Sequence, residues 1–407
     1  MTIVEQAAPE VRDISPPAPL RLEFVDGIRA CAALFVVLDH ACLESGMSYS
    51  HLWLASVLSN SGQHGLLPAW FLRLLQPLMF GHLAVCVFIV VSGYCLSLPL
   101  RGFTSTLQVG RFFQKRARRI LPTYYAAFVL SLVYIAAFGS TARQHPTLAS
   151  SNFWLNANIA FSRPVILSHI LVVQNSGTWW RHINYPLWSI ATECQIYLLF
   201  PLLVLLRRRF SMVMMLNGAL LTSVLLTVLL NQCHGSMNAS PWFVSLFAFG
   251  MVAAEKSREE GDGKRWGFAA LGLFVFALLV GSLTSLLWDH IGMMDLLAGA
   301  ISACVLIYCA QRKTYPPTPS LKGRGVIRPL LLRFLESQPL VAIGTFSYSL
   351  YLVHVPVLSW CHSLLMSPGL SPLSVVLSLI GVGVGASIAV AYVFHLLFER
   401  PFLSQRR

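Results

Sequence analysis

Long apolar segments separated by short polar stretches dominate this chain. A membrane-spanning helix needs about 20 mostly apolar residues. The pattern predicts ten spanning helices, the sixth shorter than the others, at residues 24–43, 82–100, 120–139, 187–206, 211–230, 241–254, 267–288, 291–310, 339–361 and 371–397. The apolar segment 165–173 is too short to span, and we expect it to be amphipathic or re-entrant.

This pattern indicates an all-α, polytopic integral membrane protein with one transmembrane domain. We assign residues 21–402 to that domain. Residues 1–20 contain four prolines and scattered acids but no apolar run, so we expect a disordered cytoplasmic tail and not a signal peptide. Residues 403–407 are expected to form a second, short cytoplasmic tail.

Composition agrees with a membrane protein. Hydrophobic residues make up 56% of the 407 positions and charged residues only 11%, whereas a soluble domain carries about 25% charged residues. This balance excludes a water-soluble globule, a disordered chain and a nucleic-acid-binding module. The nine cysteines form no CxxC pair, so the spacing predicts neither a metal centre nor a disulfide framework.

Basic residues are unevenly distributed between alternate loops. With the N-terminus in the cytoplasm, nearly all of the 29 Lys and Arg fall on the cytoplasmic side. The exceptions are Arg73, Arg143, Arg163 and Arg181. Since cytoplasmic loops are enriched in Lys and Arg, this asymmetry predicts ten helices with both termini inside. The net charge of +13 is therefore first a topology signal.

Tryptophan shows the opposite bias. Every Trp except Trp266 lies in a predicted outer loop or at an outer helix end, including Trp179, Trp180 and Trp188. An interfacial aromatic belt is one interpretation. Because a belt should be present on both sides, an outward-facing platform for carbohydrate rings is the other.

Ionisable residues within membrane spans are costly and mark functional sites by default. Those well inside the predicted spans are Asp39, His40, Glu193, Asp295, His354 and His395, with Asp26 and Arg29 at an inner edge and His82 at an outer edge, where it is a possible partner of Asp295. Arg29 and His40 are 11 residues apart, so at 100° per residue they share one helix face, about 16 Å apart along the axis. A snorkelling arginine and a hydrogen-bonded core histidine are the structural alternative.

A histidine in such a place is suited to proton transfer near neutral pH. A carboxylate would then orient the ring and stabilise the imidazolium. Asp39 points about 100° away from His40 on the helix, which makes it a poor partner by this geometry. Glu193 comes from another helix, so its position stays open.

A second candidate site precedes the third predicted helix. Arg116 and Arg119, at i and i+3, share a helix face. Two guanidinium groups on one face can hold phosphates. The alternative is a basic anchor beside anionic lipid.

Six short motifs occur in a fixed order along the chain. They are Val25-Asp-Gly-Ile-Arg29-Ala30 continuing to His40, Phe88-Ile-Val-Val-Ser92-Gly93-Tyr94, Arg116-Ala-Arg-Arg119-Ile-Leu-Pro122, Leu187-Trp188-Ser189-Ile-Ala-Thr-Glu193, Ser347-Tyr348-Ser-Leu-Tyr351-Leu-Val-His354 and Phe398-Glu399-Arg-Pro401. Together they resemble the acyltransferase-3 family of bacterial polytopic membrane O-acyltransferases. The resemblance spans residues 22–402.

This resemblance implies about ten helices around an intramembrane reaction chamber. It also implies transfer of an acyl group, usually acetyl, from cytoplasmic acyl-CoA to a hydroxyl of a glycan or glycosylated metabolite, as in polysaccharide O-acetylation. We therefore expect a multi-pass protein of the bacterial inner (plasma) membrane. Its expected partners are membrane lipid and a carbohydrate-containing acceptor, with no nucleic acid and no metal; homo-oligomerisation stays open.

The resemblance also assigns roles to residues. His40 would be the catalytic base, with Glu193 and Asp39 as further catalytic candidates. The donor would be held by Arg29, Arg116, Arg119, Ser92 and Tyr94. The acceptor side would involve Trp179, Trp180, Trp188, Tyr348 and His354. Two positions depart from the family pattern, because Tyr94 stands where Phe is common and Asp39 where an apolar or aromatic residue is usual.

A different function class fits some of the same residues. A proton-coupled transporter would use Asp39, His40 and Glu193 as a relay. Such transporters show two related halves with broken helices in matching places, which this sequence does not display. The Arg116–Arg119 pair also lacks a purpose in that interpretation.

Overall fold

The computed structural model describes residues 22–45, 78, 80–103, 108–144, 152–157, 160–232, 240–283, 290–314, 329–365 and 370–403. Throughout these ranges the regular elements are helices, as the apolar pattern predicts. The two predicted tails lie outside the described residues, apart from residue 403.

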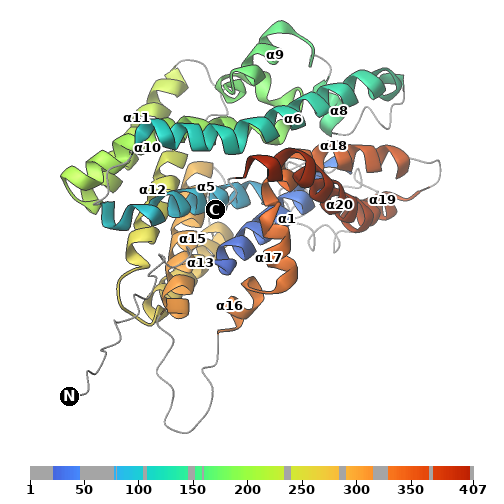
Figure 1. Cartoon of the computed structure of the whole chain (residues 1–407). Coiled ribbons are helices and arrows are strands. Elements are labelled where there is room, and N and C mark those ends of the chain that lie inside the picture. The colour runs from blue at the N-terminus through green and yellow to red at the C-terminus, as the bar shows by residue number, and fades with distance from the viewer. Residues whose placement is uncertain are drawn as a thin grey trace, which may run out of the picture.

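Each of the ten predicted spans contains a helix (Figure 1). The long helices are α1 (Glu23–Glu44), α5 (Gly81–Ser97), α6 (Val109–Gln144), α10 (Trp188–Arg209), α11 (Met212–Gln232), α12 (Phe243–Lys256), α13 (Lys264–Leu283), α15 (Ile291–Thr314) and α18 (Ser347–Leu365). The ninth span combines α17 (Gln338–Thr345) with α18. The tenth combines α19 (Pro372–Ser378), α20 (Val384–Phe394) and two π-helical turns, η7 (Leu379–Gly383) and η8 (His395–Glu399).

Shorter elements complete the described chain. They are α8 (Asn152–Asn156), α9 (Arg163–Ile170), α16 (Leu330–Leu335) and the short turns η2 (Leu98–Phe103), η4 (Gln174–Ser176), η5 (Thr178–Arg181), η6 (Tyr185–Leu187) and η9 (Arg400–Phe402). The segment predicted to be too short to span, 165–173, begins within the eight-residue helix α9.

The number of spans differs from the prediction. Among the described residues, seven helices are long and apolar enough to cross a membrane, and α17 with α18, bent by 78°, makes an eighth if it is one span. The α12 helix has only 14 residues, and α1 carries Glu23, Asp26, Arg29 and Asp39. These two helices account for the difference. The count of ten and the side of both termini therefore stay predictions.

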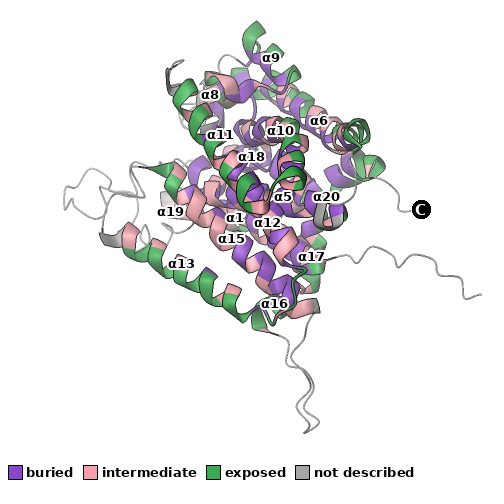
Figure 2. Cartoon of the chain, turned by 90° about the vertical axis from the view of Figure 1, so that its left-hand side faces the viewer, coloured by how far each residue is buried: buried purple, intermediate pink, exposed green. Residues whose placement is uncertain are grey.

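The centre of the bundle is formed by α1, α5, α12 and α18. In the apolar window of α5, 67% of residues are buried inside the protein, against 6% in α13. Figure 2 shows α13 exposed along one edge of the molecule. Since an apolar exposed helix surface suits hydrocarbon, α13 is the helix best placed to face lipid and α5 is central.

Two glycines bring α5 and α12 into backbone contact. A Cβ atom on Gly93 would overlap the carbonyl oxygen of Phe247, and one on Gly250 would overlap that of Val90. Small residues permit this close approach between helices in membranes. The Ser92-Gly93 motif therefore has a packing reason that is independent of chemistry.

The charge pattern predicts that the C-terminal ends of α5, α10, α12 and α15 lie on one side of the membrane, and polar contacts join these ends in the structure. The Arg207 guanidinium at the end of α10 pairs with the Glu255 carboxylate at the end of α12. Arg258 donates to the Leu98 carbonyl just after α5. The Gln311 side chain, near the end of α15, donates to the Lys256 carbonyl at 2.9 Å. The ends of α5, α10, α12 and α15 thus form one end of the bundle.

Candidate active site

A cavity of about 200 Å³ lies between α1, α5, α6, α10, α17, α18 and η8. Three arginines line it: Arg29 from α1, and Arg116 and Arg119 from one face of α6. Arg118, between them in sequence, is exposed and does not line it. The structure therefore brings together the three guanidinium groups that the sequence predicts as a donor site.

Two carboxylates share this cavity with the arginines. The Glu193 carboxylate accepts from the Ser92 hydroxyl at 2.8 Å and from the Tyr197 hydroxyl. These two hydroxyls are themselves 2.8 Å apart. Ser92 and Glu193 are thus in the cavity wall, but Tyr94 is not among its lining residues and its ring is buried in the core. The structure gives no support to the donor-binding role predicted for Tyr94.

The second carboxylate belongs to Glu399, which sequence reasoning did not select. Its side chain is 2% exposed and lines the cavity. Its Oε2 atom accepts from the Ser349 hydroxyl at 2.5 Å and from His395 Nδ1 at 2.8 Å. The π-helical turn η8 holds His395 and Glu399, and π-turns are frequent at functional sites. The Phe398–Pro401 motif, which contains Glu399, is the sequence feature that could have pointed to this residue.

His40 and His354 form a hydrogen-bonded pair one turn beyond the cavity. Nδ1 of His40 lies 2.6 Å from Nε2 of His354, and the two ring planes differ by only 3°. His354 is fully buried. Tyr351, which lines the cavity, has its ring centroid 5.8 Å from that of His354. His40 itself is not among the lining residues described.

The tautomer of this pair follows from a third contact. Nδ1 of His354 lies 3.0 Å from the Leu350 carbonyl oxygen, which can only accept a hydrogen bond. The proton of a neutral His354 is therefore on Nδ1, and its Nε2 accepts from His40 Nδ1. Nε2 of His40 is left with a free lone pair, which is the form that a general base requires.

Asp39 corrects the expectation drawn from helix geometry. Its Oδ2 lies 3.7 Å from His40 Nε2, and its side chain is 1% exposed. The 100° separation describes the Cα–Cβ directions, whereas a histidine ring extends far enough to lean toward the preceding residue. Glu193 instead belongs to the Ser92 and Tyr197 network. The carboxylate beside the His40 ring is therefore Asp39, not Glu193.

Comparisons with known proteins identify the family of the chain. The acyltransferase-3 family, described as an acyltransferase domain, matches residues 22–395. The chain belongs to the acyltransferase-3 family. It is 24% identical over 371 residues to the acyltransferase MdmB of Streptomyces mycarofaciens, a match that covers 86% of this chain and 82% of MdmB. The protein is thus a membrane acyltransferase.

A second relative is longer than this chain. The peptidoglycan O-acetyltransferase OatA of Listeria monocytogenes is 23% identical over 312 residues, which cover 69% of this chain and 45% of OatA. The chain therefore matches less than half of the length of that relative. No solved structure matches the chain.

The predicted acceptor residues of this acyltransferase do not all meet at the cavity. Tyr348 lines it and donates to the Ile120 carbonyl at 3.2 Å. Trp179 and Trp180 are half-buried in η5, and Trp188 begins α10 with its ring centroid 6.0 Å from that of Phe243. None of these tryptophans is among the lining residues, so their carbohydrate-platform role stays a prediction.

Glu44 is a further residue that sequence reasoning missed. It lies one turn after His40 on α1 and is fully buried. Its carboxylate accepts from the Tyr185 hydroxyl at 3.2 Å and from the Phe153 backbone at 3.1 Å. The Tyr185 ring meets the His40 ring edge-on, with centroids 4.9 Å apart. Glu44 thus ties two connecting segments to the helix that carries His40.

Proposed function

We propose that this protein is an O-acetyltransferase that moves an acetyl group from acyl-CoA to a hydroxyl of a glycan or glycosylated metabolite. The observation that carries the proposal is one continuous arrangement. Three guanidinium groups line a cavity, and the His40–His354 pair lies just beyond the Tyr351 side of that cavity. One end suits an anionic donor and the other suits proton transfer.

In this proposal the three arginines of the cavity bind the acyl donor. Phosphate groups cannot enter hydrocarbon cheaply, and guanidinium groups bind phosphate oxygens in a forked geometry. Arg29, Arg116 and Arg119 would hold the phosphates of CoA at the end of the bundle where α1 and α6 begin. By the charge pattern this is the cytoplasmic side. The thin pantetheine arm would then carry the thioester past Tyr351 toward His40.

In this proposal His40 is the general base that takes the proton of the acceptor hydroxyl. Its Nε2 would remove the proton from the acceptor hydroxyl while that oxygen attacks the thioester carbonyl. The carbon–sulfur bond then breaks, and the imidazolium returns the proton to the leaving thiolate. Asp39 Oδ2, 3.7 Å from Nε2, would stabilise the transient imidazolium. His354 holds the ring and its tautomer, as the acid residue of a catalytic triad does.

The acceptor is proposed to be a carbohydrate that approaches from the opposite end of the bundle. The name of OatA, a peptidoglycan O-acetyltransferase, supports this acceptor class. The half-buried tryptophans and the Glu44 network lie in or beside the segments joining α6 to α10, which are predicted to be on the outer side. We place the protein in the bacterial inner membrane on the same reasoning. Family membership favours transfer over the transporter alternative.

The test uses membrane vesicles that contain the full chain, radiolabelled acetyl-CoA and the carbohydrate fraction of the host envelope. We expect label to enter that fraction as an alkali-labile ester, with release of free CoA. His40→Gln should abolish both, while His362→Gln, a change at another buried histidine, should leave them. Transfer that persists in His40→Gln would overturn the role of His40, and transfer that does not depend on acetyl-CoA would overturn the donor.

A further inference from the structure

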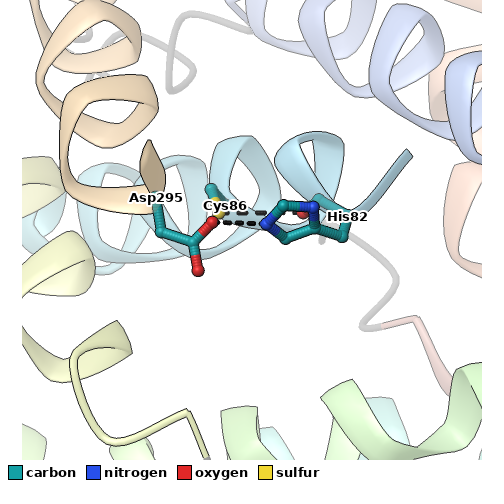
Figure 3. A group of neighbouring side chains, drawn as sticks. All are labelled: His82, Cys86 and Asp295. Atoms are coloured by element: carbon teal, nitrogen blue, oxygen red, sulfur yellow. Dashed lines mark hydrogen bonds and ion pairs between the residues drawn. The ribbon is translucent and has the colours of Figure 1, made fainter. Parts of the chain in front are cut away.

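A second group of ionisable side chains converges away from the cavity. His82 and Cys86 on α5 and Asp295 on α15 point toward one another (Figure 3). One ligand atom from each, a histidine nitrogen, a thiol sulfur and a carboxylate oxygen, lies within 4.8 Å of the other two. None of the three lines the guanidinium cavity. Nothing in the proposed transfer reaction uses them.

Local structure explains why these atoms meet. His82 and Cys86 are one helical turn apart, so their side chains leave the same face of α5. That face packs against α15, where Asp295 is 1% exposed. His82 Nε2 lies 2.5 Å from Asp295 Oδ1, and the Cys86 thiol donates to the His82 carbonyl at 3.7 Å.

The second oxygen of Asp295 is also held. Trp242, immediately before α12, donates its indole N–H to Oδ2 at 2.7 Å. Metal-binding carboxylates are typically oriented by such an outer hydrogen bond, which leaves the other oxygen for the ion. The indole thus fixes the carboxylate with Oδ1 directed at His82.

We propose that His82, Cys86 and Asp295 form a binding site for one divalent transition-metal ion, with Zn²⁺ the best match. Zinc accepts nitrogen, sulfur and oxygen ligands together and is satisfied by three protein ligands and an open fourth position. The Cys86 thiol releases its proton to water as the ion binds, and the resulting thiolate and the carboxylate together balance the two charges of the ion.

Binding requires a small movement of His82 and the loss of the Cys86 hydrogen bond to the His82 carbonyl, because a thiolate cannot donate. In a tetrahedral zinc site two N/O ligand atoms lie about 3.3 Å apart, so the contact between His82 Nε2 and Asp295 Oδ1 must widen and lose its shared proton. His82 can supply this movement because its side chain is 27% exposed, whereas Asp295 is buried. The exposed side of His82 is also where water would occupy the fourth position.

A metal ion bound at this site would hold neighbouring helices together. The site joins α5 to α15, and Trp242 connects it to the start of α12. It lies at the opposite end of α5 from the contact between Leu98 and Arg258. A bound ion would therefore fasten the helices at the end that is farther from the guanidinium groups.

The test measures metal binding by the purified full chain, stripped with a chelator and carrying an affinity tag without histidine. We expect one equivalent of Zn²⁺ to be retained after desalting, and Co²⁺ to produce a thiolate-to-cobalt charge-transfer band. Cys86→Ser should abolish that band and weaken Zn²⁺ binding by at least about tenfold. Cys361→Ser, at a buried cysteine on α18, is the matched control and should change neither.

A second variant separates metal binding from folding. His82→Gln keeps a hydrogen-bond donor for Asp295 but removes the imidazole, so it should fold and still lose Zn²⁺ affinity. Zn²⁺ should raise the thermal unfolding midpoint of the unaltered chain and of Cys361→Ser but not of His82→Gln. If the unaltered chain retains no Zn²⁺, or if Cys86→Ser and His82→Gln retain as much as the control, the cluster is only a hydrogen-bonded His–Asp pair.

Discussion

His40 Nδ1 lies 2.6 Å from His354 Nε2, although the two residues are 314 positions apart in the chain. The Leu350 carbonyl fixes the proton of His354 on the other nitrogen. The contact therefore decides which nitrogen of His40 is available as a base. Under the proposed mechanism His354 positions the His40 ring. Its role in acceptor binding stays a prediction.

The first prediction concerns this pair. His354→Ala should lower kcat by about 100-fold, the lower range for general acid–base catalysis, because the His40 tautomer is no longer set. KM for acetyl-CoA should change little, since the arginines are untouched. Steady-state kinetics in vesicles measures both. His362→Ala, at another buried histidine of α18, is the control; a loss of the same size there would point to packing alone.

The second prediction concerns the arginines of α6. Arg116→Ala and Arg119→Ala should each raise KM for acetyl-CoA about tenfold or more, because a charge-assisted hydrogen bond to phosphate contributes about 1.5–3 kcal/mol. Arg118→Ala, at the exposed arginine between them, should leave KM unchanged. Equal effects at all three positions would indicate a general attraction to anionic lipid in place of a specific donor site.

The third prediction concerns Glu399. Glu399→Gln should destabilise the protein by about 1–3 kcal/mol, because the buried Ser349 hydroxyl and His395 ring lose a charged acceptor. Thermal unfolding in detergent measures this. Glu259→Gln, at a carboxylate that is 43% exposed and paired with Lys256, is the comparison and should change stability by less than about 1 kcal/mol. An unchanged midpoint in Glu399→Gln would contradict the network.

The fourth prediction tests the close packing of α5 and α12. Gly250→Ala should sharply reduce the yield of folded protein, because its Cβ would overlap the Val90 carbonyl oxygen. Gly272→Ala on α13 should be neutral or stabilising, since nothing lies within 4 Å of its added Cβ and alanine favours helix over glycine by about 1 kcal/mol. Size-exclusion profiles of the two variants provide the measurement, and similar profiles would argue against the contact.

Local pattern predicted the helices and the grouping of the arginines that line the cavity. The i, i+3 spacing correctly placed Arg116 and Arg119 on one face, because that spacing depends only on helix geometry. The same reasoning misjudged Asp39, since it follows backbone directions and not the reach of a ring. It singled out Asp295 and His82 as a possible pair, which the structure brings together, but it selected neither Glu399 nor Cys86, because their partners come from helices distant in sequence or carry no marked spacing.

The sequence by itself determined the helical segments, the concentration of basic residues in alternate loops between them, and the family of the protein. Each of these depends on residues that are close together in the chain or on the order of short motifs. Only the tertiary structure decided which carboxylate accompanies His40, which histidine orients it and which side chains surround the cavity. These choices depend on how helices pack, and Gly93 and Gly250 show that a single missing Cβ can determine which surfaces meet.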